Sequence, residues 1–384
     1  MTESPHGAVE QLLDVLEKLP FVSTLKRDIQ SLRSVLYERR APRIAAVGRP
    51  GSGRSRLGNA LLGKDALPTD RPMAPGQWLR VDAHGSRIDW LEIDPQNTQD
   101  TQDTQEPSSD DDPGAAPPLL DRALAEAVPD VVLVPIAPRE LDDHQTAGLD
   151  AVSELLGRIG AFYETPPPII AVLSRVDEVP PATEGADPWP EEKLQAIDLL
   201  RQRLEAAVRE RGLDVRAVLA ASAAGDSGIE ELSTVIFAEL PETARLEGAR
   251  ALGRATGARR GVANQIVHSC STLALTIGLA PVPLSDAFII APLQVVMVSA
   301  IAHLGGGPWD RKAALEWIGS MGVVGGTGMG LRWTAQQLAK LIPGAGTLVS
   351  AGIAGAGTAT LGQGAIAYFL GDGPKELPRR ASQS

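Results

Sequence analysis

Short apolar runs alternate with helix-patterned stretches between residues 43 and 239. Runs rich in Val, Ile, Leu and Ala predict buried strands at 43–48, 87–94, 130–137, 168–174 and 215–222. Apolar residues three and four positions apart predict helices at 55–63, 119–127, 144–161, 191–211 and 228–239. Strand–helix alternation is typical of a parallel sheet covered by helices on both faces. We therefore expect an α/β doubly wound domain.

Helical patterns also flank this domain. Leucines and isoleucines at helical spacing over 8–40 predict an amphipathic arm, which Pro20 divides. After about residue 244, long uncharged stretches separated by proline and glycine predict about four helices. We expect an N-terminal helical arm at 1–40, the α/β domain at 41–243, a C-terminal all-α glycine-rich domain at 244–372 and a tail at 373–384.

One segment inside the α/β pattern has a different composition. Residues 96–118 contain a repeated TQD triplet, an acidic run and several prolines. Such polar, low-complexity sequence cannot bury enough apolar surface to fold, so we expect a disordered insertion.

Composition and charge exclude several classes of protein. The 384-residue chain has a net charge of −12 at pH 7, so no nucleic-acid partner is expected. A single cysteine, Cys270, excludes an internal disulfide framework and a multi-cysteine zinc site. The N-terminus lacks a basic start followed by an apolar core, so we expect no signal peptide and a cytoplasmic protein.

A glycine-rich segment lies between the first predicted strand and the first predicted helix. In this context, backbone N–H groups and the helix dipole favour a bound phosphate. The candidate residues are Gly48, Gly51, Ser52, Gly53, Arg54 and Ser55. The Ser55 hydroxyl is placed to contact Mg²⁺, but the usual P-loop pattern has lysine at the position of Arg54. A glycine-rich turn that binds no ligand is the alternative interpretation.

The order of the later motifs resembles Era/TrmE-type, translation-factor-class P-loop GTPases over about residues 41–240. Asp94 ends a predicted strand where that family has Asp-x-x-Gly. The segment Ser174-Arg175-Val176-Asp177 looks like a variant of the guanine-reading Asn/Thr-Lys-x-Asp motif. Ser222-Ala223, which follows the last predicted strand, looks like the final base-binding motif.

This resemblance implies that the chain binds GTP or GDP with Mg²⁺. It implies that Ser55 and Asp94 support the metal ion and that the base is read by Arg175, Asp177, Ser222 and Ala223. Guanine suits Asp177, because a carboxylate can accept hydrogen bonds from both the N1–H and the N2 amine. The alternative for Asp177 is an ordinary surface acid beside Glu178.

The departures from the family concern the groups that serve hydrolysis. Arg54 replaces the P-loop lysine, and the glycine of Asp-x-x-Gly is missing after Asp94. No switch-I threonine is evident in 71–78, and no glutamine or histidine follows Asp94 at a catalytic spacing. Since phosphoryl transfer depends on positioned charges, we expect a slow or regulatory GTPase, and whether the chain is an enzyme stays open.

The C-terminal region has long uncharged segments at 287–305 and 341–371. Their length permits membrane insertion, whereas Gln294 and His303 favour a bundle outside the bilayer, so both interpretations stay open. Small residues at helical spacing predict close helix contacts along Gly322, Gly326 and Gly330 and along Gly352, Ala356, Thr360 and Gly364. Residues 250–372 resemble the bacterial DUF697 helical region, which is often fused to GTPase domains.

The function expected from these features is a bacterial guanine-nucleotide-binding protein that couples nucleotide state to its C-terminal helical module. Residues 250–372 are expected to contact a membrane surface, at the inner face of the cell membrane, or a protein partner, and a homo-oligomer is one outcome. The alternative is a catalytically dead pseudo-GTPase scaffold that acts through helix-mediated assembly or membrane interaction.

Overall fold

The computed structural model describes residues 22–63, 65–69, 76–94, 119–142, 147–162, 165–181, 189–255, 257–279, 290–307, 309–324 and 346–371. The chain divides into two compact units. One unit is Ala41–Thr256, and the other combines Met1–Arg40 with Gly257–Ser384. The predicted insertion at 96–118 lies outside the described residues.

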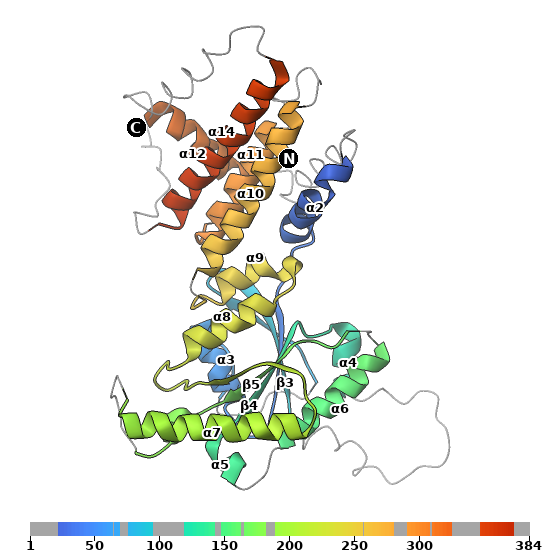
Figure 1. Ribbon diagram of the computed structural model, residues 1–384, viewed down its shortest axis with the longest axis vertical. Helices are drawn as coiled ribbons and strands as arrows, with labels where there is room; N and C mark the ends of the chain where they lie inside the picture. Colours follow the sequence, from blue (N-terminus) through green and yellow to red (C-terminus); the bar gives the residue numbers. More distant parts are fainter. Residues whose placement is uncertain are drawn as a thin grey trace, which may run out of the picture. The chain divides into compact units, whose positions relative to one another are not determined.

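The Ala41–Thr256 unit is built on a six-stranded sheet with the order β2-β3-β1-β4-β5-β6 (Figure 1). The strands are β1 (Arg43–Val47), β2 (Leu79–Ala83), β3 (Ser86–Ile93), β4 (Val131–Ile136), β5 (Ile169–Leu173) and β6 (Val215–Ala220). All neighbours run parallel except β2 and β3, which form an antiparallel pair. The five predicted strands are confirmed. The sheet is mixed rather than wholly parallel because a sixth strand, β2, which was not predicted, runs antiparallel to β3.

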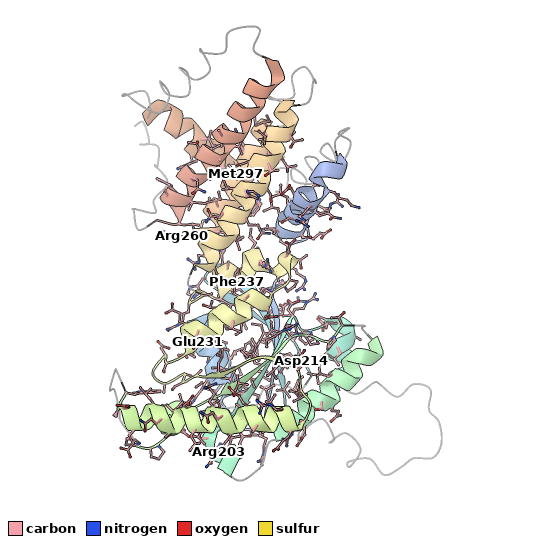
Figure 2. All side chains as sticks on the ribbon, viewed as in Figure 1. Arg203, Asp214, Glu231, Phe237, Arg260 and Met297 are labelled. Atoms are coloured by element: carbon pink, nitrogen blue, oxygen red, sulfur yellow. The ribbon has the colours of Figure 1, made fainter. Side chains whose placement is uncertain are left out.

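Helices cover both faces of this sheet, which confirms the α/β doubly wound class. The helices are α3 (Arg54–Leu62), α4 (Leu119–Glu126), α5 (Pro138–Asp142), α6 (Ala147–Phe162), α7 (Glu191–Glu210), α8 (Ile229–Glu239) and α9 (Glu242–Ala251), with a short 3₁₀ turn η2 at Val176–Glu178. Alternate strand residues point to opposite faces. On one face, apolar residues of β1, β3, β4 and β5 form a core with α4, α6 and α7. The exposed Arg203 lies on the outer face of α7 (Figure 2).

The second face packs against α3 and α9. Trp90 of β3 is completely buried, and a Cβ atom at Gly58 of α3 would lie 2.9 Å from its ring. On the same strand, the Ser86 hydroxyl donates to the Glu247 carbonyl of α9 at 3.1 Å. These contacts hold α3 and α9 on this face of the sheet.

The other unit is helical, as predicted for its C-terminal part. Its helices are α2 (Val22–Leu32), a π-helical turn η1 (Arg33–Tyr37), α10 (Ala258–Leu279), α11 (Ala291–Leu304), α12 (Arg311–Val324) and α14 (Gly346–Phe369). The helical arm packs on α10, where Gln265 donates to the Ser31 hydroxyl at 3.0 Å. Met297 of α11 is fully buried in this unit (Figure 2).

Small residues bring α10 and α14 close together, but the predicted stripe is not the one in contact. A Cβ atom at Gly362 would lie 2.4 Å from a Val267 methyl, so the two helices touch there. Ala356 and Thr360 of the predicted stripe are exposed. The second predicted stripe, at 322, 326 and 330, extends beyond the described residues.

Polar side chains within the helical unit contact other side chains of the same unit. Gln294 of α11 donates to the Thr358 hydroxyl of α14 at 3.0 Å. His303 meets the Trp309 ring edge-on, with the ring centroids 5.5 Å apart. Within the part of the chain that the structure describes, no helix combines the length and the apolar character that a bilayer crossing requires.

Candidate functional site

The glycine-rich loop joins the end of β1 to the start of α3. Gly48 donates its N–H to the Ile93 carbonyl at 3.1 Å, which ties the loop to the end of β3. Gly51 and Gly53 have φ values of +83° and +95°, a backbone conformation that favours glycine. Gly53 is the N-cap of α3. The loop therefore delivers the N-terminus of a helix, where unpaired N–H groups and the helix dipole can meet an anion.

Ser52 faces the protein interior. Its side chain is fully buried, and its Oγ has no hydrogen-bond partner among the described residues. Its N–H donates to the Arg49 carbonyl at 3.1 Å, and its own carbonyl accepts the Ser174 hydroxyl at 2.6 Å. Ser52 therefore contributes to the loop through its backbone, which Ser174 fixes from the end of β5.

Arg54 turns away from the loop and towards the end of β3. Its Nη1 donates to the Ile93 carbonyl at 2.8 Å. Its Nε lies 3.6 Å from Glu92 Oε2, and its Nη2 lies 4.0 Å from Asp94 Oδ2. The Arg54 side chain is only 11% exposed. The guanidinium is thus enclosed by two carboxylates and a carbonyl.

The sequence did not single out Glu92. This residue organises the corner formed by the end of β3 and the start of α3, where Arg54, Ser55 and Asp94 lie. Its carboxylate is buried and accepts the Ser55 hydroxyl at 2.7 Å and the Trp90 indole N–H at 3.4 Å. The signal in the sequence was an acid within an apolar strand, two positions after Trp90 and therefore on the same face of the sheet. Because Ser55 binds Glu92, its hydroxyl proton points into the protein.

The residues of this corner do not fit Mg²⁺ in the arrangement that the structure has. The Ser55 hydroxyl donates its proton to Glu92 and keeps its oxygen lone pairs, but the guanidinium of Arg54 lies between Glu92 and Asp94. Mg²⁺ needs oxygen ligands whose charge is available to it, and here Arg54 already compensates both carboxylates. Among the described residues, no cluster of three or more His, Cys, Asp or Glu could hold a metal ion.

Asp177 and Ser222 are brought together from two neighbouring loops. The Ser222 hydroxyl donates to Asp177 Oδ1 at 2.5 Å and accepts the N–H of Ala224 at 3.2 Å. The loops after β5 and β6 are thereby joined. This bond fixes the orientation of the Asp177 carboxylate.

Arg175 links this region to the glycine-rich loop. It has a φ of +55°, and its Nη1 donates to the Gly51 carbonyl at 2.8 Å, while its Nε binds Glu178 at 2.8 Å. Arg139, from the start of α5, donates to the same Gly51 carbonyl at 3.3 Å. Two guanidinium groups from other loops therefore lie at the tip of the glycine-rich loop.

Lys193 was also missed, although the sequence carried a signal. It lies on α7 four residues before Ile197, on the apolar stripe of that helix, and it is fully buried. Its ammonium donates to the Asp177 carbonyl at 2.7 Å and lies 4.8 Å from the centroid of the Trp189 ring. A buried lysine requires such partners, and here they fix the backbone at Asp177.

A cavity of about 500 Å³ opens beside these loops. Its lining brings together four of the predicted site residues, Gly53, Arg175, Asp177 and Ala223, and does not include Gly48, Arg54, Ser55 or Asp94. The remaining lining residues are Arg56, Leu57, Asn59, Ala60, Gly63, Asp65, Thr69, Ser174, Ala221, Ala224 and Arg254. Three of the four base-side candidates and the end of the glycine-rich loop therefore share one cavity, which Ser222 does not line. Residues 71–75 of the switch-I region at 71–78, and the segment after Asp94, lie outside the described residues.

Glu140 of α5 has a raised pKa. Its side chain is buried, Oε1 accepts the Ala137 N–H at 3.0 Å, and Oε2 has no partner among the described residues. Burial raises the pKa of Glu140 above its ordinary value, against the opposing effects of the Ala137 N–H and of Arg49, Arg139 and Arg54.

No protein-family model matches the chain, and no curated protein sequence matches it. Among solved structures it is similar to a bacterial selenocysteine-specific elongation factor, EF-Sec, with 17% identity over 51% of this chain and 28% of that chain and a TM-score of 0.31. It is similar to SsGBP in complex with GDP, with 17% identity over 64% of this chain and 70% of that chain and a TM-score of 0.33. It is also similar to an Aquifex aeolicus Era variant bound to GDP·AlF4⁻, with 19% identity over 64% of this chain and 70% of that chain and a TM-score of 0.31. The chain spans less than a third of the length of EF-Sec, and the fold assignment above rests on its own strand order and registers.

Proposed function

We propose that the Ala41–Thr256 unit binds guanine nucleotides, GTP and GDP. The observation that carries this proposal is the placement of Asp177, whose carboxylate is oriented by Ser222 at the cavity that Gly53 also lines. A fixed carboxylate can accept two hydrogen bonds from the N1–H and N2 groups of guanine, whereas adenine offers no such pair of donors. The base would lie beside Arg175 and Ala223.

The phosphates would lie at the glycine-rich loop and the N-terminus of α3. Backbone N–H groups and the helix dipole favour negative charge there. Arg139 and Arg175 bring two guanidinium groups close to the Gly51 carbonyl, of which Arg175 is also paired with Glu178. The Arg54 guanidinium, which is bound to Glu92 and Asp94, does not reach the phosphates in this arrangement.

Hydrolysis is expected to be slow or absent. Catalysis of phosphoryl transfer needs cations and a positioned water around the γ-phosphate. Arg54 and Ser55, which occupy the positions of the two P-loop groups that serve this purpose, are both bound to Glu92. The Era/TrmE-type subtype, and a role for the DUF697-like helices in reporting nucleotide state to a partner or to the inner face of the membrane, are further parts of this proposal.

The test is binding of fluorescent GTP and GDP to the full chain, with unlabelled ATP as competitor. We expect binding that GTP and GDP displace and ATP does not. Asp177→Ala should weaken it at least tenfold, about 1.4 kcal/mol, because the guanine N1–H and N2 donors lose their acceptor. The matched control is Asp198→Ala, which removes an exposed acid on α7 that pairs with Arg201. Equal loss in both variants, or displacement by ATP, would contradict guanine recognition.

The second candidate is the scaffold that binds no nucleotide, and the internal engagement of Arg54 and Ser55 favours it. The same titration separates the two candidates. A folded chain that binds neither GTP nor GDP supports the scaffold, and function would then lie in assembly through the helical unit.

A further inference from the structure

A positively charged side chain occupies the corner where the sequence predicted a metal ion. All three guanidinium nitrogens of Arg54 face acceptors at the end of β3: the Ile93 carbonyl at 2.8 Å, Glu92 at 3.6 Å and Asp94 at 4.0 Å. The group is enclosed, since the side chains of Arg54, Glu92 and Asp94 are 11%, 5% and 13% exposed. The guanidinium therefore acts as a counter-ion for both carboxylates.

The surroundings of Glu92 hold Arg54 in this place. An unpaired buried carboxylate is strongly unfavourable, so Glu92 needs a cation beside it. Its other contacts, from the Ser55 hydroxyl and the Trp90 indole N–H, are neutral. Only Arg54 supplies a full positive charge among the contacts that Glu92 makes in the described part of the chain.

This arrangement gives Mg²⁺ a poor set of ligands and an unfavourable neighbour. A metal ion at this corner could use the Ser55 oxygen, but the carboxylates beside it are already compensated by Arg54. A divalent cation placed beside the guanidinium would also be repelled, and the repulsion is strong where solvent screens little. Positive charge for the phosphates would come instead from Arg139 at the loop tip, beside Arg175, which is paired with Glu178.

We infer that guanine-nucleotide binding by this chain is independent of Mg²⁺, because Arg54 takes the place of the metal ion between Glu92 and Asp94. This inference rests on the proposed function, since it concerns the same site. It predicts that the wild-type chain binds GDP with the same affinity in excess Mg²⁺ and in excess EDTA.

The experiment is a titration of the full chain with fluorescent GDP under both conditions. We expect dissociation constants that agree within about twofold, a difference of less than half a kcal/mol. Binding that weakens tenfold or more in EDTA would overturn the inference and leave the proposed function intact. Binding in neither condition would instead overturn the proposed function, and the inference with it, so the two failures are distinguishable.

A variant tests whether Arg54 is the cause. In Arg54→Ala the two carboxylates lose their counter-ion and repel the phosphates, so GDP binding in EDTA should weaken by about tenfold and recover when Mg²⁺ is added. The matched control is Arg80→Ala, which removes an arginine that is 68% exposed and pairs with Glu126, and it should behave as wild type. Equal affinity of Arg54→Ala in EDTA and in Mg²⁺ would contradict the assigned role. If this variant does not fold, the wild-type comparison decides by itself.

Discussion

Lys193 anchors the loop that presents Asp177, and replacement by methionine tests this role. The ammonium is fully buried, donates to the Asp177 carbonyl at 2.7 Å and lies 4.8 Å from the centroid of the Trp189 ring. Methionine fills similar space but donates no hydrogen bond. Leaving this partly buried carbonyl without its partner costs at most ~1–3 kcal/mol, and the lost cation–π contact adds ~0.5–2 kcal/mol. Because the penalty for burying the ammonium is also removed, we expect a net destabilisation of about 1–2 kcal/mol.

Two measurements on Lys193→Met separate an effect on the fold from an effect on the site. Urea unfolding of the full chain gives the change in stability, and titration with fluorescent GDP gives the change in affinity. Without its anchor the Asp177 backbone can shift, and we expect about tenfold weaker GDP binding. Gln195→Met, at an exposed position on the same helix, is the control and should change stability by less than about 0.5 kcal/mol. Unchanged stability and affinity would refute the anchoring role. A loss of stability with unchanged GDP affinity would show that Lys193 stabilises the fold but does not position Asp177 for binding.

Two further predictions concern packing and pH. In α14, the Gly362→Ala variant should be less stable than the Gly357→Ala variant by about 1–3 kcal/mol in thermal unfolding. A Cβ at Gly362 would lie 2.4 Å from a Val267 methyl, whereas one at Gly357 would meet nothing within 4 Å. Equal stability of the two variants would contradict the contact. Glu140 has a raised pKa through burial, so the stability it contributes is complete below its ordinary pKa and is lost as pH rises through the raised value. Urea unfolding over this pH range should show that the free energy of unfolding falls less in Glu140→Gln than in the wild type as the pH rises. An identical fall in both would contradict the raised pKa of Glu140.

The strands could be predicted because the buried parallel strands read as apolar runs. In β4 and β5 every residue is buried, so each segment is apolar throughout. The missed strand, β2, has the sequence LRVDA, with exposed and buried positions in alternation. An edge strand needs one apolar face only, and five residues with two charges do not stand out from a loop.

The helical unit shows a different limit of sequence analysis. In α14 small and apolar residues occur on all sides, so the spacing of glycines alone cannot tell which face makes contact. The face that packs contains Gly355, Thr358 and Gly362, whereas the predicted stripe has Ala356 and Thr360 exposed. The shape of α10 decides which face of α14 packs against it, because Val267 and Leu275 of α10 fill the space that the glycines leave.

For the site, the structure brings the end of the glycine-rich loop and the loops after β5 and β6 to one cavity, but the directions of the side chains depend on residues outside the motifs. Arg54 and Ser55 were predicted to face phosphate and metal, and whether they bind a nucleotide stays a prediction. Their present directions are set by Glu92, a residue that no P-loop motif contains. A substitution at one motif position therefore has to be interpreted with its neighbours across the sheet, because the acid on β3 and the arginine on α3 compensate each other.

The hydrogen bonds among the loops bear on how the proposed site would bind nucleotide. The Ser52 carbonyl accepts from Ser174, and the Gly51 carbonyl accepts from both Arg139 and Arg175. The glycine-rich loop is thus held in shape by side chains from two other strand ends. A loop that is already ordered loses little conformational entropy on binding, which favours affinity. The separate bonds of Arg54 and Ser55 to Glu92 oppose a rearrangement of these two side chains towards a γ-phosphate, so the proposed site would favour binding of nucleotide over its hydrolysis.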